Sequence, residues 1–335
     1  MAKIAFVILY YGKWPSYWRL WAESAQRNPQ FDFIVVTDLD PPDPVPENVH
    51  LVNVAFQDMT SRFSKVIGVP LQNVSYHKLC DFKPFCGLVF NELLRPYSYW
   101  GYCDVDLFFG NLTPLYDHAI SNEFDFISPY KCTVGHCTLI RNEPRVNELC
   151  LKIPDLETRI QKSQISFLDE GALSEVAVKE GGYTFCVVGN IVEEWRREKP
   201  FLGATALHDG RIDGLDGWFF LHYKDGVIVV FDDELRGHEA LYFHFMGMKN
   251  RRYWTELPRC DLNRFTFTSF GIAPGLLPPS AKRSAAFYAT CLRAHARGSA
   301  YRLIRDALPI PLLRTVKDAY KNLKSIRRNA KGKPA

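Results

Sequence analysis

The chain has 335 residues, of which 47% are hydrophobic and 23% charged, a balance typical of globular proteins. No stretch approaches the roughly 18 apolar residues that cross a bilayer, so the sequence predicts no membrane-spanning helix. The formal net charge of +4 hides an asymmetry: residues 281–335 hold 14 Lys and Arg against two Asp, whereas residues 1–280 hold 27 basic and 35 acidic residues.

The first elements predict an α/β fold. KIAFVIL (3–9) is a short apolar run typical of a buried strand, residues 16–27 have helical periodicity, and FDFIVVTD (31–38) is a second strand. Strand, helix and strand at this spacing form a βαβ unit, so we expect a mostly parallel, Rossmann-like sheet with helices on both faces. The apolar run at 3–9 is too short for the core of a signal peptide, and we therefore expect a cytoplasmic location.

The same alternation continues along the chain. Strands are predicted at 50–54, 97–104, 124–128, 226–231 and 240–245, and helices at 76–94, 142–153 and 168–181. Pro and Gly accumulate after about residue 264. We therefore expect one domain over 1–264, followed over 265–335 by a linker and a basic amphipathic helical tail.

Two carboxylates interrupt the aromatic stretch YSYWGYCDVDLFFGN (97–111). Asp104 and Asp106 fall at the carboxyl end of a predicted central strand, where ligands of open parallel sheets bind. A D-x-D pair there can hold a divalent cation, such as Mn²⁺ or Mg²⁺, against a diphosphate. A second pair, Asp38 and Asp40, precedes Pro-Pro-Asp-Pro and is typical of a solvated turn, although Asp38 can still contact a nucleoside.

With the Asp104–Asp106 pair and the downstream segment YFHFMGMK (242–249), the sequence resembles the bacterial GT-A glycosyltransferases. The segment is similar to the H-x-x-G-x-K element of glycosyltransferase family 8, a group of retaining enzymes that includes glycogenin and lipopolysaccharide galactosyltransferases. The resemblance implies that His244 completes the metal shell of the two Asp, and that Gly247 and Lys249 approach the diphosphate. Asn-Arg-Arg-Tyr-Trp then replaces the usual Pro-Trp, which favours a related family acting in surface polysaccharide assembly.

Further residues are assigned to the donor. GT-A enzymes usually offer a basic and an acidic residue to the donor before the D-x-D strand, which implies Asp81 and Lys83; an exposed ion pair at a helix start is the alternative. Tyr10 and Tyr11, at the end of the first strand, are expected to border the nucleobase, with plain packing as the alternative.

FLDEGAL (167–173) resembles the D-Q-D stretch of family 8, in which a helix start faces the transferred sugar. This resemblance implies that Asp169 binds donor hydroxyls, with Glu170 beside it. Were the reaction inverting, Asp169, Glu170 or Asp209 would serve as the base. The alternative is that these acids only complement the helix dipole.

The basic tail has apolar residues at helical spacing between its Lys and Arg. Such a helix can lie on an anionic membrane surface, so we expect peripheral binding to the inner face of the cytoplasmic membrane. Packing on the body is the alternative, and no nucleic-acid recognition module is apparent.

The sequence thus predicts a metal-dependent hexosyltransferase. Its expected donor is a nucleotide diphosphate sugar, UDP-linked, and its expected acceptor is a saccharide or a lipid-linked glycan. The alternatives are a sugar-nucleotide nucleotidyltransferase and a non-catalytic nucleotide- or glycan-binding protein on the same fold.

Overall fold

The computed structural model describes residues 3–72, 74–121, 123–188, 191–194, 203–207, 210–211, 220–232, 234–246, 261–268 and 271–283. The helices in these ranges are α1 (Trp18–Gln26), α2 (Phe56–Ile67), η1 (Tyr76–Phe85), α3 (Cys86–Val89), α4 (Asn91–Leu94), α5 (Thr113–Ser121), α6 (Pro144–Asn147), η2 (Glu148–Lys152), α7 (Leu156–Gln161), η3 (Leu168–Ala172), α8 (Leu173–Glu180) and η5 (Pro279–Arg283). The strands are β1 (Ile4–Leu9), β2 (Phe31–Thr37), β3 (Val49–Asn53), β4 (Tyr99–Cys103), β5 (Leu107–Phe109), β6 (Phe126–Ser128), β7 (Cys137–Arg141), β8 (Phe185–Val187), β9 (Ile191–Glu194), β10 (Gly203–Leu207), β11 (Gly210–Arg211), β12 (Phe220–Lys224), β13 (Val227–Phe231), β14 (Gly237–Ala240), β15 (Tyr242–His244), β16 (Arg264–Thr268) and β17 (Gly271–Pro274). Among the described residues, no helix has both the length and the apolar character needed to span a membrane.

The main layer is a seven-stranded sheet in the order β3-β2-β1-β4-β7-β6-β8. Strands β3, β2, β1 and β4 pair in parallel, β7 is antiparallel to both neighbours, and β6 pairs with β8 in parallel. The continuous apolar runs of β1 and β2 suit a sheet that is buried on both faces. The predicted mixed α/β fold with a largely parallel sheet is confirmed.

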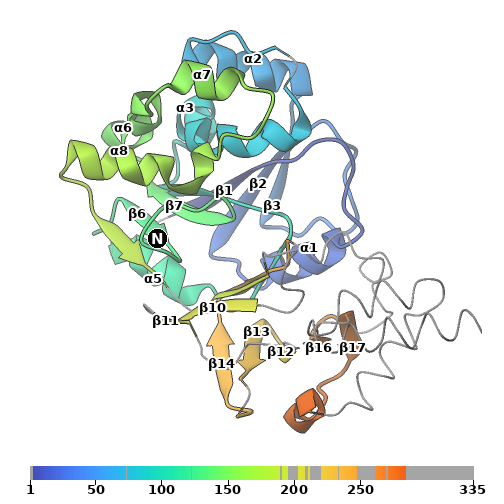
Figure 1. Cartoon of the computed structure of the whole chain (residues 1–335). Helices are drawn as coiled ribbons and strands as arrows, with labels where there is room; N and C mark the ends of the chain where they lie inside the picture. The colour runs from blue at the N-terminus through green and yellow to red at the C-terminus, as the bar shows by residue number, and fades with distance from the viewer. Residues whose placement is uncertain are drawn as a thin grey trace, which may run out of the picture.

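The two faces of the sheet form two cores. Successive side chains of a strand point to opposite faces. On β1, Ile4, Phe6 and Ile8 pack in a core with residues of α1 and α5, whereas Ala5 and Val7 pack in a second core with residues of α2, η1 and α8. Figure 1 shows α1 and α5 on one side of the sheet and α2, α3, α6, α7 and α8 on the other, as predicted.

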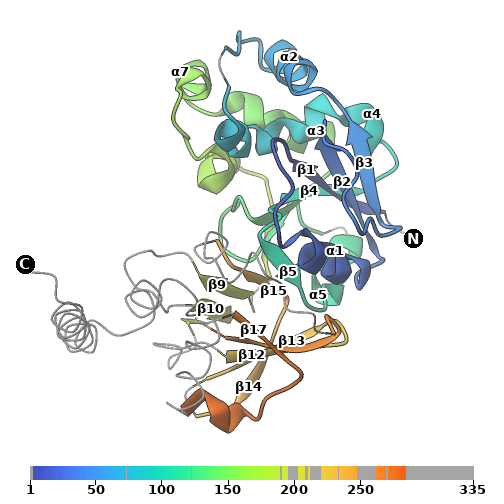
Figure 2. The ribbon, with the colours of Figure 1, turned by 90° about the vertical axis from the view of Figure 1, so that its right-hand side faces the viewer.

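Two smaller sheets lie on the side of α1 and α5, opposite α2 and α7 (Figures 1 and 2). One has the order β11-β10-β9-β15-β5 and the other β14-β13-β12-β16-β17. Strand β5 follows β4 directly but pairs antiparallel with β15 rather than with the large sheet. Strand β16 begins at the expected boundary, residue 264, and β17 follows it, so this sheet extends past that position. The predicted tail beyond residue 283 lies outside the described residues.

The single helix predicted over 76–94 is instead a 3₁₀ helix, η1, followed by the short helices α3 and α4. Pro84 lies within η1. Because proline has no N–H and its ring clashes with the preceding turn, it prevents a continuous α-helix there. Lys78, Asp81 and Lys83 all lie within this 3₁₀ helix rather than along the face of one long α-helix.

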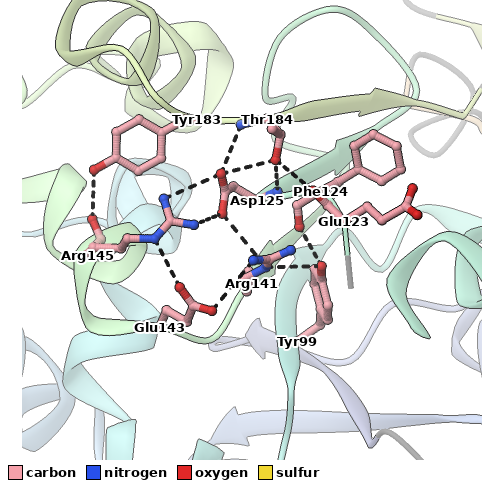
Figure 3. Close-up of polar contacts among 9 residues, drawn as sticks. All are labelled: Tyr99, Glu123, Phe124, Asp125, Arg141, Glu143, Arg145, Tyr183 and Thr184. Carbon is pink, nitrogen blue, oxygen red and sulfur yellow. Dashed lines mark hydrogen bonds and ion pairs between the residues drawn. The ribbon is translucent and has the colours of Figure 1, made fainter. Parts of the chain in front are cut away.

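A buried carboxylate ties the far edge of the large sheet together (Figure 3). Asp125, 1% exposed, precedes β6 and accepts hydrogen bonds from the Thr184 amide at 2.9 Å and the Thr184 hydroxyl at 3.1 Å. It also forms an ion pair with Arg145, and Arg141 Nε lies 3.8 Å from its Oδ1. These contacts neutralise the carboxylate and join β7 and the residue before β8 to β6.

We expect Asp125→Ala to lower the free energy of unfolding by about 3 kcal/mol, because it removes the buried carboxylate that Arg141 faces, leaves Arg141 only the half-exposed Glu143 at 3.6 Å, and takes away the acceptor of the Thr184 amide. Arg145→Ala should cost no more than about 1 kcal/mol, since the Arg145 side chain is 44% exposed and Asp125 keeps its bonds to Thr184. Urea unfolding of both variants measures the difference. Equal losses would contradict this account.

Candidate functional site

Three side chains from two sheets meet beyond the carboxyl end of β4. Asp104 and Asp106 lie in the short link between β4 and β5, and His244 ends β15, whose register with β5 sets it opposite Leu107. The Phe245 amide donates to the Asp106 carbonyl at 3.0 Å, which fixes the link against β15. Potential ligand atoms of Asp104, Asp106 and His244 all lie within 4.8 Å of one another. The structure thus brings together the three residues that the sequence assigned to a metal.

The three residues differ in exposure. Asp106 is 4% exposed and His244 is 3% exposed, and their side chains approach to 3.7 Å between Oδ1 and Nε2. The Asp104 side chain is 33% exposed. Two carboxylate oxygens and an imidazole nitrogen form a donor set that suits Mn²⁺ or Mg²⁺, and the more open Asp104 leaves access from solvent.

Lys83 connects this group to a further carboxylate. Its Nζ lies 2.6 Å from Asp104 Oδ1 and 3.2 Å from Asp169 Oδ2, and it donates to the Gly135 carbonyl at 2.9 Å. Burial opposes the charged form of Lys83, but the two carboxylates outweigh it and hold the pKa of the ammonium well above its usual value. Lys83 is therefore a permanent positive charge between Asp104 and Asp169.

Asp169 is 3% exposed and packs against the Gly135 backbone. A Cβ on residue 135 would lie 2.2 Å from Asp169 Oδ2, so only glycine fits while Asp169 keeps this position. Burial raises the pKa of Asp169 to about 7, helped by Asp104 and Glu170 and opposed by Lys83. Asp169 Oδ1 is buried and has no hydrogen-bond partner in the described part of the chain. A buried oxygen of this kind is a candidate acceptor for a ligand hydroxyl.

Within the described residues, the site holds more carboxylates than ammonium groups. Asp104 and Asp169 are both paired with Lys83, and the buried Asp106 lies beside them in the link after β4. Charges taken out of water are costly unless they are neutralised. A cation at Asp104, Asp106 and His244 would supply that neutralisation.

A second histidine, His136, supports His244. Their rings stack with centroids 4.6 Å apart, and His136 Nδ1 is hydrogen-bonded to the Tyr242 hydroxyl at 3.0 Å. The His136 carbonyl accepts from the Asp104 amide at 3.1 Å. His136 therefore orients both sides of the triad, as outer partners of metal ligands commonly do. The sequence did not predict this role, because His136 belongs to neither of the two motifs. It comes close to His244 only once β15 has paired with β5.

Of the residues predicted to border a nucleobase, Tyr10 lies beside the site. Burial, and then the charge of Asp106, raise the pKa of Tyr10 to about 12. Its ring stacks on Trp14 at 5.1 Å. Tyr11 instead points into the α2 side, where its hydroxyl donates to the Val54 carbonyl at 3.0 Å. Asp38 is exposed and accepts from the Phe56 amide at 3.2 Å, at the start of α2.

Asp81 acts inside the protein rather than on its surface. It is fully buried, pairs with Lys78 at 2.7 Å, and accepts from the amides of Ser166 at 2.8 Å and Leu168 at 2.9 Å. Both carboxylate oxygens are thus engaged within the protein. The alternative of an exposed ion pair is wrong, and a carboxylate oxygen of Asp81 lies within 4.8 Å of one of Asp169.

The remaining predicted residues divide into two groups. Glu170 is exposed, and its Oε1 accepts from the Gly135 amide at 3.2 Å, so it helps to hold the two loops together. Gly247 and Lys249 lie outside the described residues, as does Asp209, and their roles remain predictions from the sequence.

A family model matches most of the chain. It is described as "Family of unknown function (DUF6625)" and matches residues 6–274. The matched range contains Asp104, Asp106 and His244 and all three sheets apart from the first two residues of β1, and it ends before the basic tail. A search of curated proteins found no match.

We expect Asp169→Asn to stabilise the metal-free protein in a pH-dependent manner. Folding raises the pKa of Asp169 from near 4 in the unfolded chain to near 7 in the folded chain. Below pH 4 the acid is protonated in both states and does not affect the free energy of unfolding, whereas above pH 7 its buried charge lowers that free energy by the full amount. The gain in the free energy of unfolding should therefore be small at pH 4 and reach a few kcal/mol by pH 8, at about 1.4 kcal/mol per pKa unit. Urea unfolding across this range tests the prediction, and a pH-independent difference would refute it.

Proposed function

We propose that this chain, which belongs to the family of unknown function DUF6625, is a metal-dependent glycosyltransferase of the GT-A type. It would move a hexose from a nucleotide diphosphate sugar, UDP-linked, to a hydroxyl of a saccharide or lipid-linked glycan in surface polysaccharide assembly. The observation that carries the proposal is the meeting of Asp104, Asp106 and His244 within 4.8 Å at the carboxyl end of β4.

The topology supports the proposal. Strands β3, β2, β1 and β4 form the parallel half of the sheet, and the D-x-D pair follows the strand beside which the sheet turns antiparallel. Ligands of open α/β sheets bind beyond such carboxyl ends. Tyr10, at the end of β1, lies near Asp106 and offers an aromatic ring for the nucleoside.

Each residue of the site has a part in the proposed reaction. A divalent cation bound by Asp104, Asp106 and His244 would neutralise the charge of the departing diphosphate. Lys83 holds Asp104 and Asp169 in fixed positions by its two ion pairs. The buried Asp169 Oδ1 accepts a hydroxyl of the donor sugar, which orients the anomeric carbon toward the acceptor. We further propose that the anomeric configuration is retained, as the resemblance to family 8 implies.

The first test is metal-dependent donor binding and turnover. A UDP-sugar at 100 times its Kd should raise the Tm by several degrees in the presence of Mn²⁺, since such saturation adds about 2.7 kcal/mol to the stability. Asp104→Ala and His244→Ala should abolish the shift and lower the release of nucleoside diphosphate at least about 100-fold.

His50→Ala provides a matched control, because His50 forms a similar pair with Asp32 at 3.0 Å on the surface, apart from the site. This variant should keep both the shift and the turnover. A donor shift that persists without Mn²⁺ and in Asp104→Ala would refute the metal site. Formation of pyrophosphate from a nucleoside triphosphate and a sugar 1-phosphate, with no nucleoside diphosphate released from the UDP-sugar, would instead assign a nucleotidyltransferase.

The second test separates Asp169 from the metal. Gly135→Ala should force Asp169 away from Lys83, because the new Cβ would clash with its carboxylate. We expect at least about tenfold lower turnover with the Mn²⁺-dependent donor shift retained. Lys131→Ala, an exposed position in the same loop, should leave turnover unchanged. Full turnover in Gly135→Ala would show that the position of Asp169 is irrelevant to the reaction.

A further inference from the structure

The residue two positions before Asp169 combines two unusual features. Phe167 has a left-handed backbone, with φ 52° and ψ 48°, which side chains other than glycine rarely adopt. Its side chain is also 61% exposed, so the ring gains little from burial. A large aromatic side chain in a strained conformation, turned to solvent, does not serve the stability of the fold.

The structure holds Phe167 in this conformation from both sides. The amides of its two neighbours, Ser166 and Leu168, both donate to the carboxylate of Asp81. Lys78 neutralises that carboxylate and donates to the carbonyls of Arg159 and Gln164, at 2.9 and 2.8 Å. A buried ion pair is therefore used to fix a three-residue segment whose middle member is exposed.

The position of this segment relative to the site indicates its use. Within two residues the chain passes from the exposed ring of Phe167 to Asp169, whose buried Oδ1 has no hydrogen-bond partner among the described residues. Two residues of extended chain span no more than about 7 Å, which is close to the width of one sugar ring. A sugar that binds Asp169 would thus lie within about one ring width of Phe167, which is exposed to solvent.

A pyranose ring suits such a surface. Several of its C–H bonds point to one side and form an apolar face, and this face packs on aromatic rings while the hydroxyls remain solvated. The donor sugar needs shelter from water, which the buried Asp169 provides, whereas an acceptor must arrive from solvent.

We propose that Phe167 is the stacking platform of the acceptor site and binds the apolar face of an acceptor pyranose. This inference rests on the proposed glycosyltransferase function. It assigns the Lys78–Asp81 pair as a positioning device for the platform, and a saccharide as the acceptor class.

Direct binding tests the proposal without turnover. The full chain, with Mg²⁺ and UDP, is mixed with methyl α- and β-glycosides of glucose, galactose and N-acetylglucosamine, and saturation-transfer NMR is recorded. We expect transfer to the ring C–H protons of at least one glycoside, with the Kd raised at least tenfold in Phe167→Ala and held within threefold in Phe167→Trp. If the wild type gives no saturation transfer to any glycoside, or if Phe167→Ala binds the glycosides with the same Kd, the proposal is overturned.

Stability provides the control against misfolding. Phe167→Gly relieves the left-handed conformation, so its Tm should equal or exceed that of the wild type while glycoside binding is lost. Asp155→Gly relieves a similar conformation, with φ 54°, at the start of α7, and should leave glycoside binding unchanged. A fall in Tm for Phe167→Gly together with lost binding would assign Phe167 to the fold instead.

Two further readouts separate this proposal from its premise. With water as the only acceptor, release of nucleoside diphosphate should be unchanged in Phe167→Ala. If the wild type releases none either with or without a glycoside acceptor, the proposed transferase fails, while glycoside binding still decides the role of Phe167. Pelleting with phosphatidylglycerol vesicles that is lost in Phe167→Ala, with glycoside binding retained, would identify a membrane contact and overturn the acceptor platform.

Discussion

The site is organised by one ammonium group between two carboxylates. Lys83 lies within 3.2 Å of both Asp104 and Asp169, which come from opposite ends of the site and from distant parts of the chain. Without this charge, three carboxylates would face one another in a largely buried space, and their repulsion would push the loops apart. The bridge offsets one of these negative charges and joins the link after β4 to the loop that carries Asp169. A single ion pair network thus holds the two sides of the site together.

Glycine and a second ion pair supply the geometry that charge alone cannot. Gly135 lets Asp169 approach the backbone more closely than any side chain would allow, and the Lys78–Asp81 pair fixes the residues that precede it. Both the Lys78–Asp81 pair and Gly135 are buried, unlike residues that bind a ligand directly from solvent. Their contribution is precision of placement, and buried hydrogen bonds and close packing give that precision because neither tolerates small displacements.

The sequence was sufficient for features that depend on local pattern. Strands β1 and β2 and helix α1 are continuous apolar or amphipathic runs, and Asp104 and Asp106 stand out because carboxylates are rare beside such runs. His244 was found only by a motif, since an imidazole on an aromatic strand has an ordinary structural explanation. The structure then brought the three together through the β5–β15 pairing, which no local pattern encodes.

The role of Asp81 could not be read in the same way. Lys78 lies three residues before Asp81 and Lys83 two residues after it, yet Lys78 forms a structural pair and Lys83 enters the site. The distinction arises from contacts of Asp81 with Ser166 and Leu168, which lie 85 and 87 positions downstream. Likewise, nothing in the sequence around Gly135 and His136 predicts their roles. These roles depend on the approach of Asp169 to Gly135 and of His244 to His136, which only the fold determines.

The pairing of β5 with β15 also has a consequence for synthesis of the chain. Ribosomes deliver residues in order, and N-terminal parts of a protein fold first. Lys83 and Asp104 therefore emerge close together and can compensate each other early. The apolar strand β5 has no pairing partner until β15 has been synthesised, more than 130 residues later. Until then the nascent protein displays an open hydrophobic edge, the type of surface that chaperones recognise and that recruits other chains into aggregates.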